Sequence, residues 1–218
     1  MSGTTLLLAR HGHAHCNHTG TIGGTRGCTG LTDHGRDEAE SLAARLLRVH
    51  NRSPITALYT SPLPRATETA TYVAAALDTT AVTLPDLREP DYGTADGQPW
   101  GDVVARFGRI PAEHPYLPIA EGAETWTNHY SRVATALQHL ISRHRDHTIA
   151  IIGHGETITA AAHMFLGLPP GARATSVFLT DNASLTTWQE QPLSWTRPAA
   201  GSRWALVGHN DTSHLHDV

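Results

Sequence analysis

The sequence contains no lysine, and all 16 of its basic residues are arginine. This absence excludes sites that need a lysine amine, such as a Walker A phosphate loop, a Schiff base or a Ser-x-x-Lys nucleophile. Arginine is an effective phosphate ligand because its planar guanidinium offers paired donors. A phosphate site in this chain would therefore have to be built from arginine and histidine.

Cysteine and long apolar runs are also scarce. Cys16 and Cys28 form neither a disulfide framework nor a CxxC pair, so we expect both to be reduced. The apolar run near the start of the chain covers only residues 6–9 and follows no positive charge, which argues against a signal peptide or a membrane span. We therefore expect a cytoplasmic protein that does not bind membranes.

A basic surface is missing as well, because the formal net charge is -4. Nucleic acid is therefore not an expected partner. The 218 residues are 39% hydrophobic, enough to bury a sizeable core without disulfides or zinc. We expect a single domain over residues 1–218, and a homodimer remains open.

Short apolar segments alternate with segments of helical periodicity along the chain. This alternation predicts an α/β fold: a three-layer α/β/α sandwich around a mostly parallel sheet. Residues 90–125 carry glycines and prolines without a clear period, which is typical of an insertion that caps a site. The expected strands are 4–9, 55–60, 82–87, 148–153, 176–180, 185–188 and 204–207, with the pair 176–180 and 185–188 side by side; the expected helices are 34–51, 65–76, 126–144 and 157–166.

Histidines follow two of the predicted strands. His11, within Arg10-His11-Gly12, follows the first strand, and His154 follows the most apolar one. Ligands of α/β sheets bind beyond the carboxyl ends of the strands, so both histidines are candidates for a site. A guanidinium, an imidazole and a flexible glycine together suit a phosphoryl group.

A metal site is the alternative interpretation of the first histidine. His11, His13 and His15 alternate, so an extended backbone would point them to one side, as in metal-dependent hydrolases. Such a site would also need later ligands, and the sequence offers only His154 with Asp91 or Asp181. The metal interpretation is therefore open but incomplete.

Further motifs follow Arg10-His11-Gly12 in a fixed order. They are Asn17, LTDHGR at 31–36, SPLPRATETA at 61–70, LREPDYG at 87–93, EGAET at 121–125, GHG at 153–155 and NDTSHL at 210–215. With these motifs the chain resembles the histidine phosphatase superfamily, the phosphoglycerate mutase-like fold, over nearly its whole length. The resemblance implies that no metal and no other cofactor is needed.

The resemblance also implies the roles of individual residues. His11 would attack phosphorus and form a phosphohistidine, and Glu89 would protonate the leaving alcohol and then activate water. Two nearby carboxylates, Asp91 and Glu68, remain alternatives to Glu89. The phosphate ligands would be Arg10, Asn17, Arg65, His154 and Gly155, with Arg26 of the glycine-rich run as a further contact.

The substrate is less well determined than the chemistry. His13-Ala14 replaces the acidic residue and threonine that the family commonly has here, so His13 could tune substrate choice. The insertion carries only two basic residues between positions 97 and 121, Arg106 and Arg109, which is few for a phosphomutase. We expect a phosphomonoesterase for a small phosphorylated metabolite, a sugar phosphate or nucleotide being typical. The alternatives are a phosphoglycerate-type mutase, the metal-dependent hydrolase and a domain that only binds phosphate.

Overall fold

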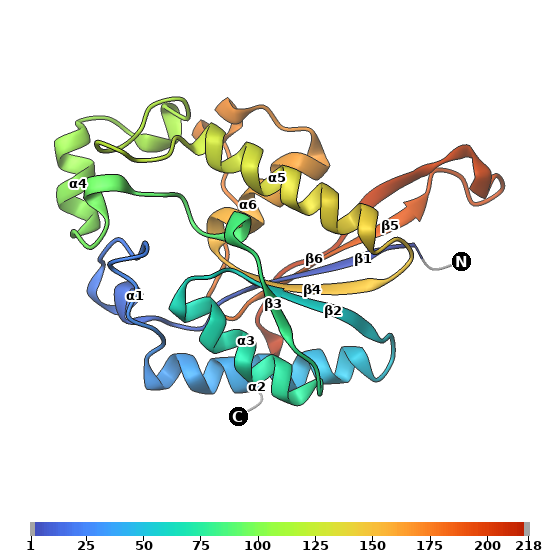
Figure 1. Ribbon diagram of the computed structural model, residues 1–218. Coiled ribbons are helices and arrows are strands. Elements are labelled where there is room, and N and C mark those ends of the chain that lie inside the picture. Colours follow the sequence, from blue (N-terminus) through green and yellow to red (C-terminus); the bar gives the residue numbers. More distant parts are fainter. Residues whose placement is uncertain (1–2, 216–218) are drawn as a thin grey trace.

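A six-stranded sheet forms the middle of the protein in the computed structural model, which describes residues 3–215 (Figure 1). The strand order is β3-β2-β4-β1-β5-β6, in which β3, β2, β4 and β1 run parallel and the β5–β6 hairpin adds an antiparallel edge. The strands are β1 (Thr5–Arg10), β2 (Ile55–Thr60), β3 (Ala81–Thr83), β4 (Thr148–Gly153), β5 (Leu185–Pro192) and β6 (Ser202–Asp211).

Helices cover both faces of the sheet. Figure 1 shows α2 (Asp33–His50) and α3 (Pro64–Ala76) on one face, and α5 (Trp126–Arg143) and α6 (Gly155–Leu166) on the other. The predicted three-layer fold with a mostly parallel sheet is therefore confirmed. Two shorter helices, α1 (His15–Thr19) and α4 (Trp100–Phe107), lie beyond one end of the sheet.

The two central strands supply apolar side chains to both layers. Along β1, Leu7 packs with α2 and α3, whereas Leu6 and Leu8 pack with α5 and α6. Ala150 and Ile151 of β4 divide in the same way. This division follows from the two-residue period of a strand and explains why the two segments are continuously apolar.

The insertion at 90–125 contains α4 and packs against the loop that follows α1. The Asp96 carboxylate accepts hydrogen bonds from the backbone nitrogens of Gly24, Arg26 and Gly27, at 2.8, 2.7 and 3.0 Å. A Cβ atom on Gly24 would lie 2.6 Å from Asp96 Cγ, so this close approach requires glycine. The segment that contains α4 is thereby joined to the loop that follows α1.

The structure corrects three details of the predicted elements. Residues 176–180 form no strand; Val177 and Leu179 are exposed, and β5 pairs with β6 instead. The strand expected at 82–87 covers only 81–83, because Pro85 begins a short 3-10 turn. The loop after β1 contains α1, which was not predicted. No helix in the described part of the chain combines the length and the apolar character needed to cross a membrane.

Candidate active site

The loops that follow β2, β4 and β1 meet at one end of the sheet. Because β4 lies between the other two strands, its terminal backbone contacts both of them. The His11 nitrogen donates to the Gly153 carbonyl at 3.0 Å, and the Ser61 nitrogen donates to the Ile152 carbonyl at 3.1 Å. The helices after β1 and β4 lie on opposite faces of the sheet, which opens a crevice between these strand ends.

His11 lies at the bottom of this crevice with 2% of its surface exposed. Its Nδ1 donates to the Gly12 carbonyl at 2.7 Å, which leaves the lone pair on Nε2. Burial lowers the pKa of His11 well below its usual value, and the Arg65 and Arg10 charges lower it further. His11 is therefore neutral, with Nε2 available as a nucleophile.

Gly12 allows this backbone to pass close to α2. A Cβ atom at position 12 would lie 2.3 Å from the Gly35 carbonyl oxygen, a distance that no side chain tolerates. The Gly12 nitrogen donates to the Thr69 hydroxyl at 3.1 Å, and that hydroxyl donates to the Arg65 carbonyl at 2.8 Å. Thr69 thus joins the loop after β1 to the helix that carries Arg65.

Two arginines line the cavity together with His11. Arg65, near the start of α3, donates through Nε to His11 Nε2 at 2.8 Å and through Nη1 to the Gly23 carbonyl at 2.6 Å. Arg10, at the end of β1, donates through Nη1 to the Thr180 carbonyl at 2.5 Å. Burial lowers the pKa of Arg10; an arginine begins from so high a value that it stays charged. The two guanidiniums therefore supply positive charge to the cavity that His11 lines.

His154 faces His11 across the crevice, with ring centroids 5.2 Å apart. Ser61 Oγ lies 2.7 Å from His154 Nε2, whereas the buried Nδ1 has no hydrogen-bond partner in the described residues. Burial lowers the pKa of His154 well below its usual value, and the charge of Arg65 adds to the effect. An unpartnered polar atom in a buried wall suits a bound ligand.

Of the three carboxyl groups that the sequence offered, Glu89, Asp91 and Glu68, Glu89 is the one that lines this cavity. Its Oε1 lies 3.9 Å from His154 Nδ1, and its Oε2 accepts from the Tyr92 hydroxyl at 2.8 Å. Burial raises the pKa of Glu89, although the Arg65 charge acts against this. Glu68 instead pairs with Arg36 at 2.9 Å, and Asp91 is an exposed residue that accepts from the Gly93 nitrogen.

The other predicted residues divide into those at the cavity and those away from it. Asn17 and Gly155 line the cavity. The Asn17 Oδ1 accepts a hydrogen bond from the Ala14 nitrogen at 3.0 Å, so the side-chain amide nitrogen is not used in that bond. Arg26 does not line the cavity; this exposed side chain donates to the Gly93 carbonyl at 2.7 Å and lies 3.8 Å from Asp96. The fold therefore keeps Arg26 at the cap rather than at the phosphate ligands.

The histidines of the metal interpretation do not converge. His13 hydrogen-bonds through Nδ1 to the Thr32 hydroxyl at 2.9 Å, and His15 is exposed on α1. Within residues 3–215, no three His, Cys, Asp or Glu side chains are grouped so that they could hold one ion. The arrangement of the described residues gives the metal-dependent alternative no support.

The cavity has a volume of about 640 Å³, with the two arginines, His11 and Glu89 at its inner end. This inner end combines a neutral imidazole, two guanidiniums and a buried acid. Such a set can hold a phosphoryl group, attack it in line and protonate a leaving oxygen. Known proteins resemble this chain both in sequence and in fold.

A family model described as "Histidine phosphatase superfamily (branch 1)" matches residues 6–199. The chain belongs to this superfamily. Its enzyme class, a phosphatase of the histidine type, agrees with the expectation from the sequence.

Individual relatives of this histidine phosphatase are similar over nearly all of the chain. "Phosphoglycerate mutase-like protein 4" of Arabidopsis thaliana is 28% identical, covering 98% of this chain and 87% of the relative. "Metal-independent phosphoserine phosphatase" of the same plant is 24% identical, covering 99% and 84%. The solved structure of Bacillus stearothermophilus YhfR superposes with a TM-score of 0.81 at 25% identity, covering 98% of this chain and 100% of that one.

The cavity of this histidine phosphatase also contains residues that sequence reasoning did not single out. Ser61 lies within the SPLPRATETA motif, but nothing in the sequence indicates that its hydroxyl contacts His154. Glu156 and Arg173 line the outer wall. Glu156 follows the GHG motif directly and could have been suspected, whereas Arg173 lies in a short 3-10 helix, Pro170–Ala174, that carries no motif.

Cys16 and Cys28 are free thiols, as expected, and both are buried beside the active-site arginine. A hydrogen bond from Cys16 and the Arg65 charge lower the pKa of the Cys28 thiol to about 5, although burial acts against this. The same hydrogen bond and burial raise the pKa of Cys16. Burial acts to lower the pKa of the Arg65 guanidinium, but the Glu89 carboxylate and Cys28 raise it.

Proposed function

We propose that this histidine phosphatase is a metal-independent phosphomonoesterase that acts on a small phosphorylated metabolite through a phosphohistidine on His11. The observation that carries the proposal is the state of His11 Nε2. It is an unprotonated, buried nitrogen that accepts from Arg65, and it faces a cavity that also contains Arg10 and a carboxyl group of raised pKa. Nucleophile, charge stabilisation and acid are thus present together.

In the first step, His11 Nε2 attacks phosphorus and the ester P–O bond breaks. The proton of Glu89 passes to the leaving alcohol, while Arg10, Arg65 and His154 hold the phosphoryl oxygens with the Asn17 amide. Without substrate, Arg65 Nε donates a hydrogen bond to His11 Nε2. When substrate enters, the N–H groups of Arg65 donate to the phosphoryl oxygens instead, which frees Nε2 to attack. In the second step, Glu89 takes a proton from water, which attacks phosphorus, and the P–N bond breaks to release phosphate.

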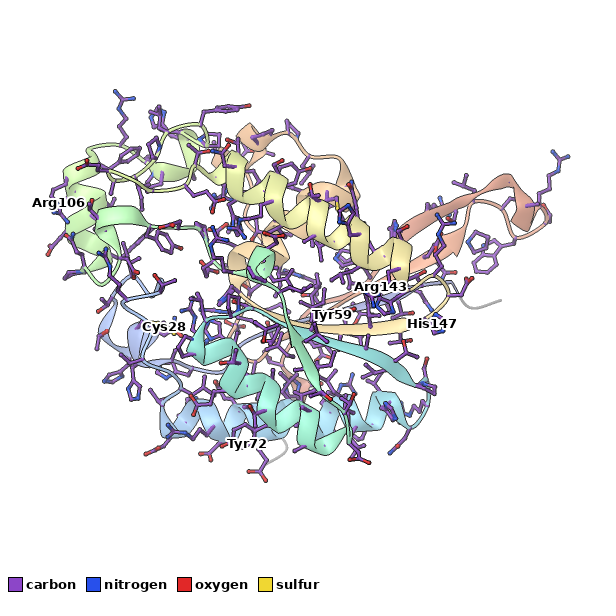
Figure 2. The ribbon with its side chains drawn as sticks, viewed as in Figure 1. Cys28, Tyr59, Tyr72, Arg106, Arg143 and His147 are labelled. Atoms are coloured by element: carbon purple, nitrogen blue, oxygen red, sulfur yellow. The ribbon has the colours of Figure 1, made fainter. Side chains whose placement is uncertain are left out.

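Hydrolysis is favoured over phosphoryl exchange by the position of the cap arginines. Arg106 donates to the Asp102 carbonyl at 3.3 Å and to Gln98, and Figure 2 shows it on the outer side of α4. Arg109 is exposed and does not line the active-site cavity. A mutase must retain a second anionic group during exchange, and neither cap arginine faces the inner end.

The names of the two plant relatives support the proposed class of substrate, a small phosphorylated metabolite. One is described as a metal-independent phosphoserine phosphatase, and the other only as similar to phosphoglycerate mutase. Both names refer to small phosphorylated compounds, the substrate class that we propose. The sequence-based choice of a sugar phosphate or nucleotide within that class stays a prediction, as do the cytoplasmic location and a homodimer.

Replacing the nucleophile tests the proposal most directly. The His11→Ala variant should lose at least about 1,000-fold in kcat for p-nitrophenyl phosphate, because no other group can form the covalent intermediate. His13→Ala is the matched control, since its imidazole lies outside the cavity and bonds to Thr32. A phosphoenzyme that is labile in acid and stable in alkali should form only when His11 is present.

Three results would contradict the proposal. Hydrolysis by His11→Ala at the wild-type rate would exclude the phosphohistidine. Loss of wild-type activity in exhaustive EDTA, with recovery on adding a divalent metal, would restore the metal-dependent alternative. Wild-type protein that hydrolyses no phosphomonoester would leave the binding-only alternative.

A further inference from the structure

The outer wall of the cavity carries an ordered ion pair. Arg173 Nη2 lies 2.7 Å from Glu156 Oε1, and the Trp126 indole nitrogen donates to Glu156 Oε2 at 2.9 Å. The Arg173 guanidinium also stacks over the Trp126 ring, 4.7 Å from its centroid. Two contacts therefore hold this guanidinium in one orientation, and the hydrogen bond from Trp126 to Glu156 joins the two partners to each other.

This ion pair is connected directly to the catalytic end. Glu156 follows His154 by two residues, in the first turn of α6, so its position is tied to the strand end that carries His154. Glu156 and Arg173 line the same cavity as His11 and Glu89. A small molecule whose phosphate lies on His11 would extend from the inner end toward this wall.

Arg173 retains unused donors on this wall. Only its Nη2 hydrogen-bonds within the described residues, and Nη1 and Nε have no partner there. The other arginines that line the cavity in the described part of the chain, Arg10 and Arg65, belong to the phosphate end. Arg173 is therefore the cation that faces the part of the substrate that leaves as an alcohol.

We propose that Arg173 determines specificity by binding a carboxylate of the leaving group, so that the preferred substrates are phosphate esters of hydroxy acids. The inference rests on the proposed phosphatase function and deepens it. A guanidinium edge matches a carboxylate in shape and charge. The neighbouring Glu156 charge favours a monoanion there over a second, dianionic phosphate, because like charges at short range repel.

Two substrates that differ in a single group provide the test. 3-Phosphoglycerate carries a carboxylate where glycerol 3-phosphate carries an alcohol. Wild-type protein should show a higher kcat/KM for 3-phosphoglycerate, by about 10-fold to 100-fold, as expected for a charge-assisted hydrogen bond. In Arg173→Gln the ratio of the two values should fall toward one, and Arg173→Lys should retain part of the preference.

Arg106→Gln is the matched control, because it removes an arginine on the outer side of the cap and should leave the ratio unchanged. A wild-type ratio near one, or an unchanged ratio in Arg173→Gln, would overturn the proposal. Calorimetric binding of the same two compounds to His11→Ala, with and without Arg173→Gln, measures the preference without turnover. Failure of the phosphatase function would thus be recognised separately from failure of the carboxylate site.

Discussion

The inner and outer ends of the active-site cavity are built differently. At the inner end, His11, Arg65 and His154 are 2%, 4% and 0% exposed and follow directly from a strand or begin a helix. At the outer end, the side chains of Glu156 and Arg173 are 29% and 21% exposed, and Arg173 comes from a short 3-10 helix, Pro170–Ala174. If the proposed roles hold, residues placed by the sheet carry out the reaction and residues of the surrounding helices select the substrate.

The difference has a kinetic meaning. In the proposed mechanism, groups at the inner end act on the phosphoryl group, which every substrate shares, so removing them should lower kcat for all esters. In the same mechanism Arg173 at the outer end contacts the leaving alcohol, so removing it should change the ranking of substrates. The following predictions test this division, from the largest expected effect to the smallest.

Glu89→Gln should lower kcat for glycerol 3-phosphate by about 100-fold to 1,000-fold, because an alkoxide needs a proton to leave. The loss should be smaller for p-nitrophenyl phosphate, whose leaving group is stable as an anion. Steady-state kinetics on both esters measure the difference. Asp91→Asn is the control, and a loss with Asp91→Asn instead of Glu89→Gln would assign the acid to Asp91.

Ser61→Ala should lower kcat by about 10-fold on every ester, because His154 Nε2 loses the partner that fixes its ring. KM should change little if Ser61 acts only through His154. Ser53→Ala removes a hydroxyl that contacts Thr148 at the opposite end of β4 and should leave kcat unchanged. Equal effects of the two substitutions on kcat would place the role of Ser61 in stability alone.

Glu156→Gln should move the alkaline limb of the pH profile to lower pH. The Glu156 charge is one of the causes that raise the pKa of Glu89. Removing it lowers that pKa, so the general acid deprotonates at lower pH and activity is lost earlier as pH rises. The profile is measured on glycerol 3-phosphate, which has no carboxylate to engage Arg173. The exposed Glu113→Gln is the control, and an unshifted limb would show that Glu156 does not act on Glu89.

Much of the inner end could be predicted because its residues follow strands. The apolar segments at 4–9 and 148–153 identify two buried strands, and residues after parallel strands meet at one edge of the sheet. The order of the strands across the sheet was therefore not needed to predict that His11 and His154 lie close together. Arg65 and Asn17 were predicted only with the family resemblance, because a single arginine or asparagine in a sequence does not by itself indicate a site.

The choice among Glu89, Asp91 and Glu68 could not be made from the sequence. All three lie near predicted functional motifs, and only packing decides that Glu68 faces Arg36 while Glu89 enters the cavity. The strand expected at 176–180 was wrong for a related reason. Its alternation of apolar residues is that of a strand, yet the neighbouring position in the sheet is occupied by β6.

The sequence by itself determined the class of the fold, and it predicted His11 as the nucleophile together with its distant partners, because strand periodicity and ordered motifs are local signals along the chain. Only the tertiary structure decided which carboxyl group is buried beside His154, that Arg26 stays with Asp96, and that Arg173 stacks on Trp126 at the outer wall. These decisions depend on side chains from segments far apart in the sequence. Their contacts, charges and burial exist only once the helices and loops have packed against the sheet.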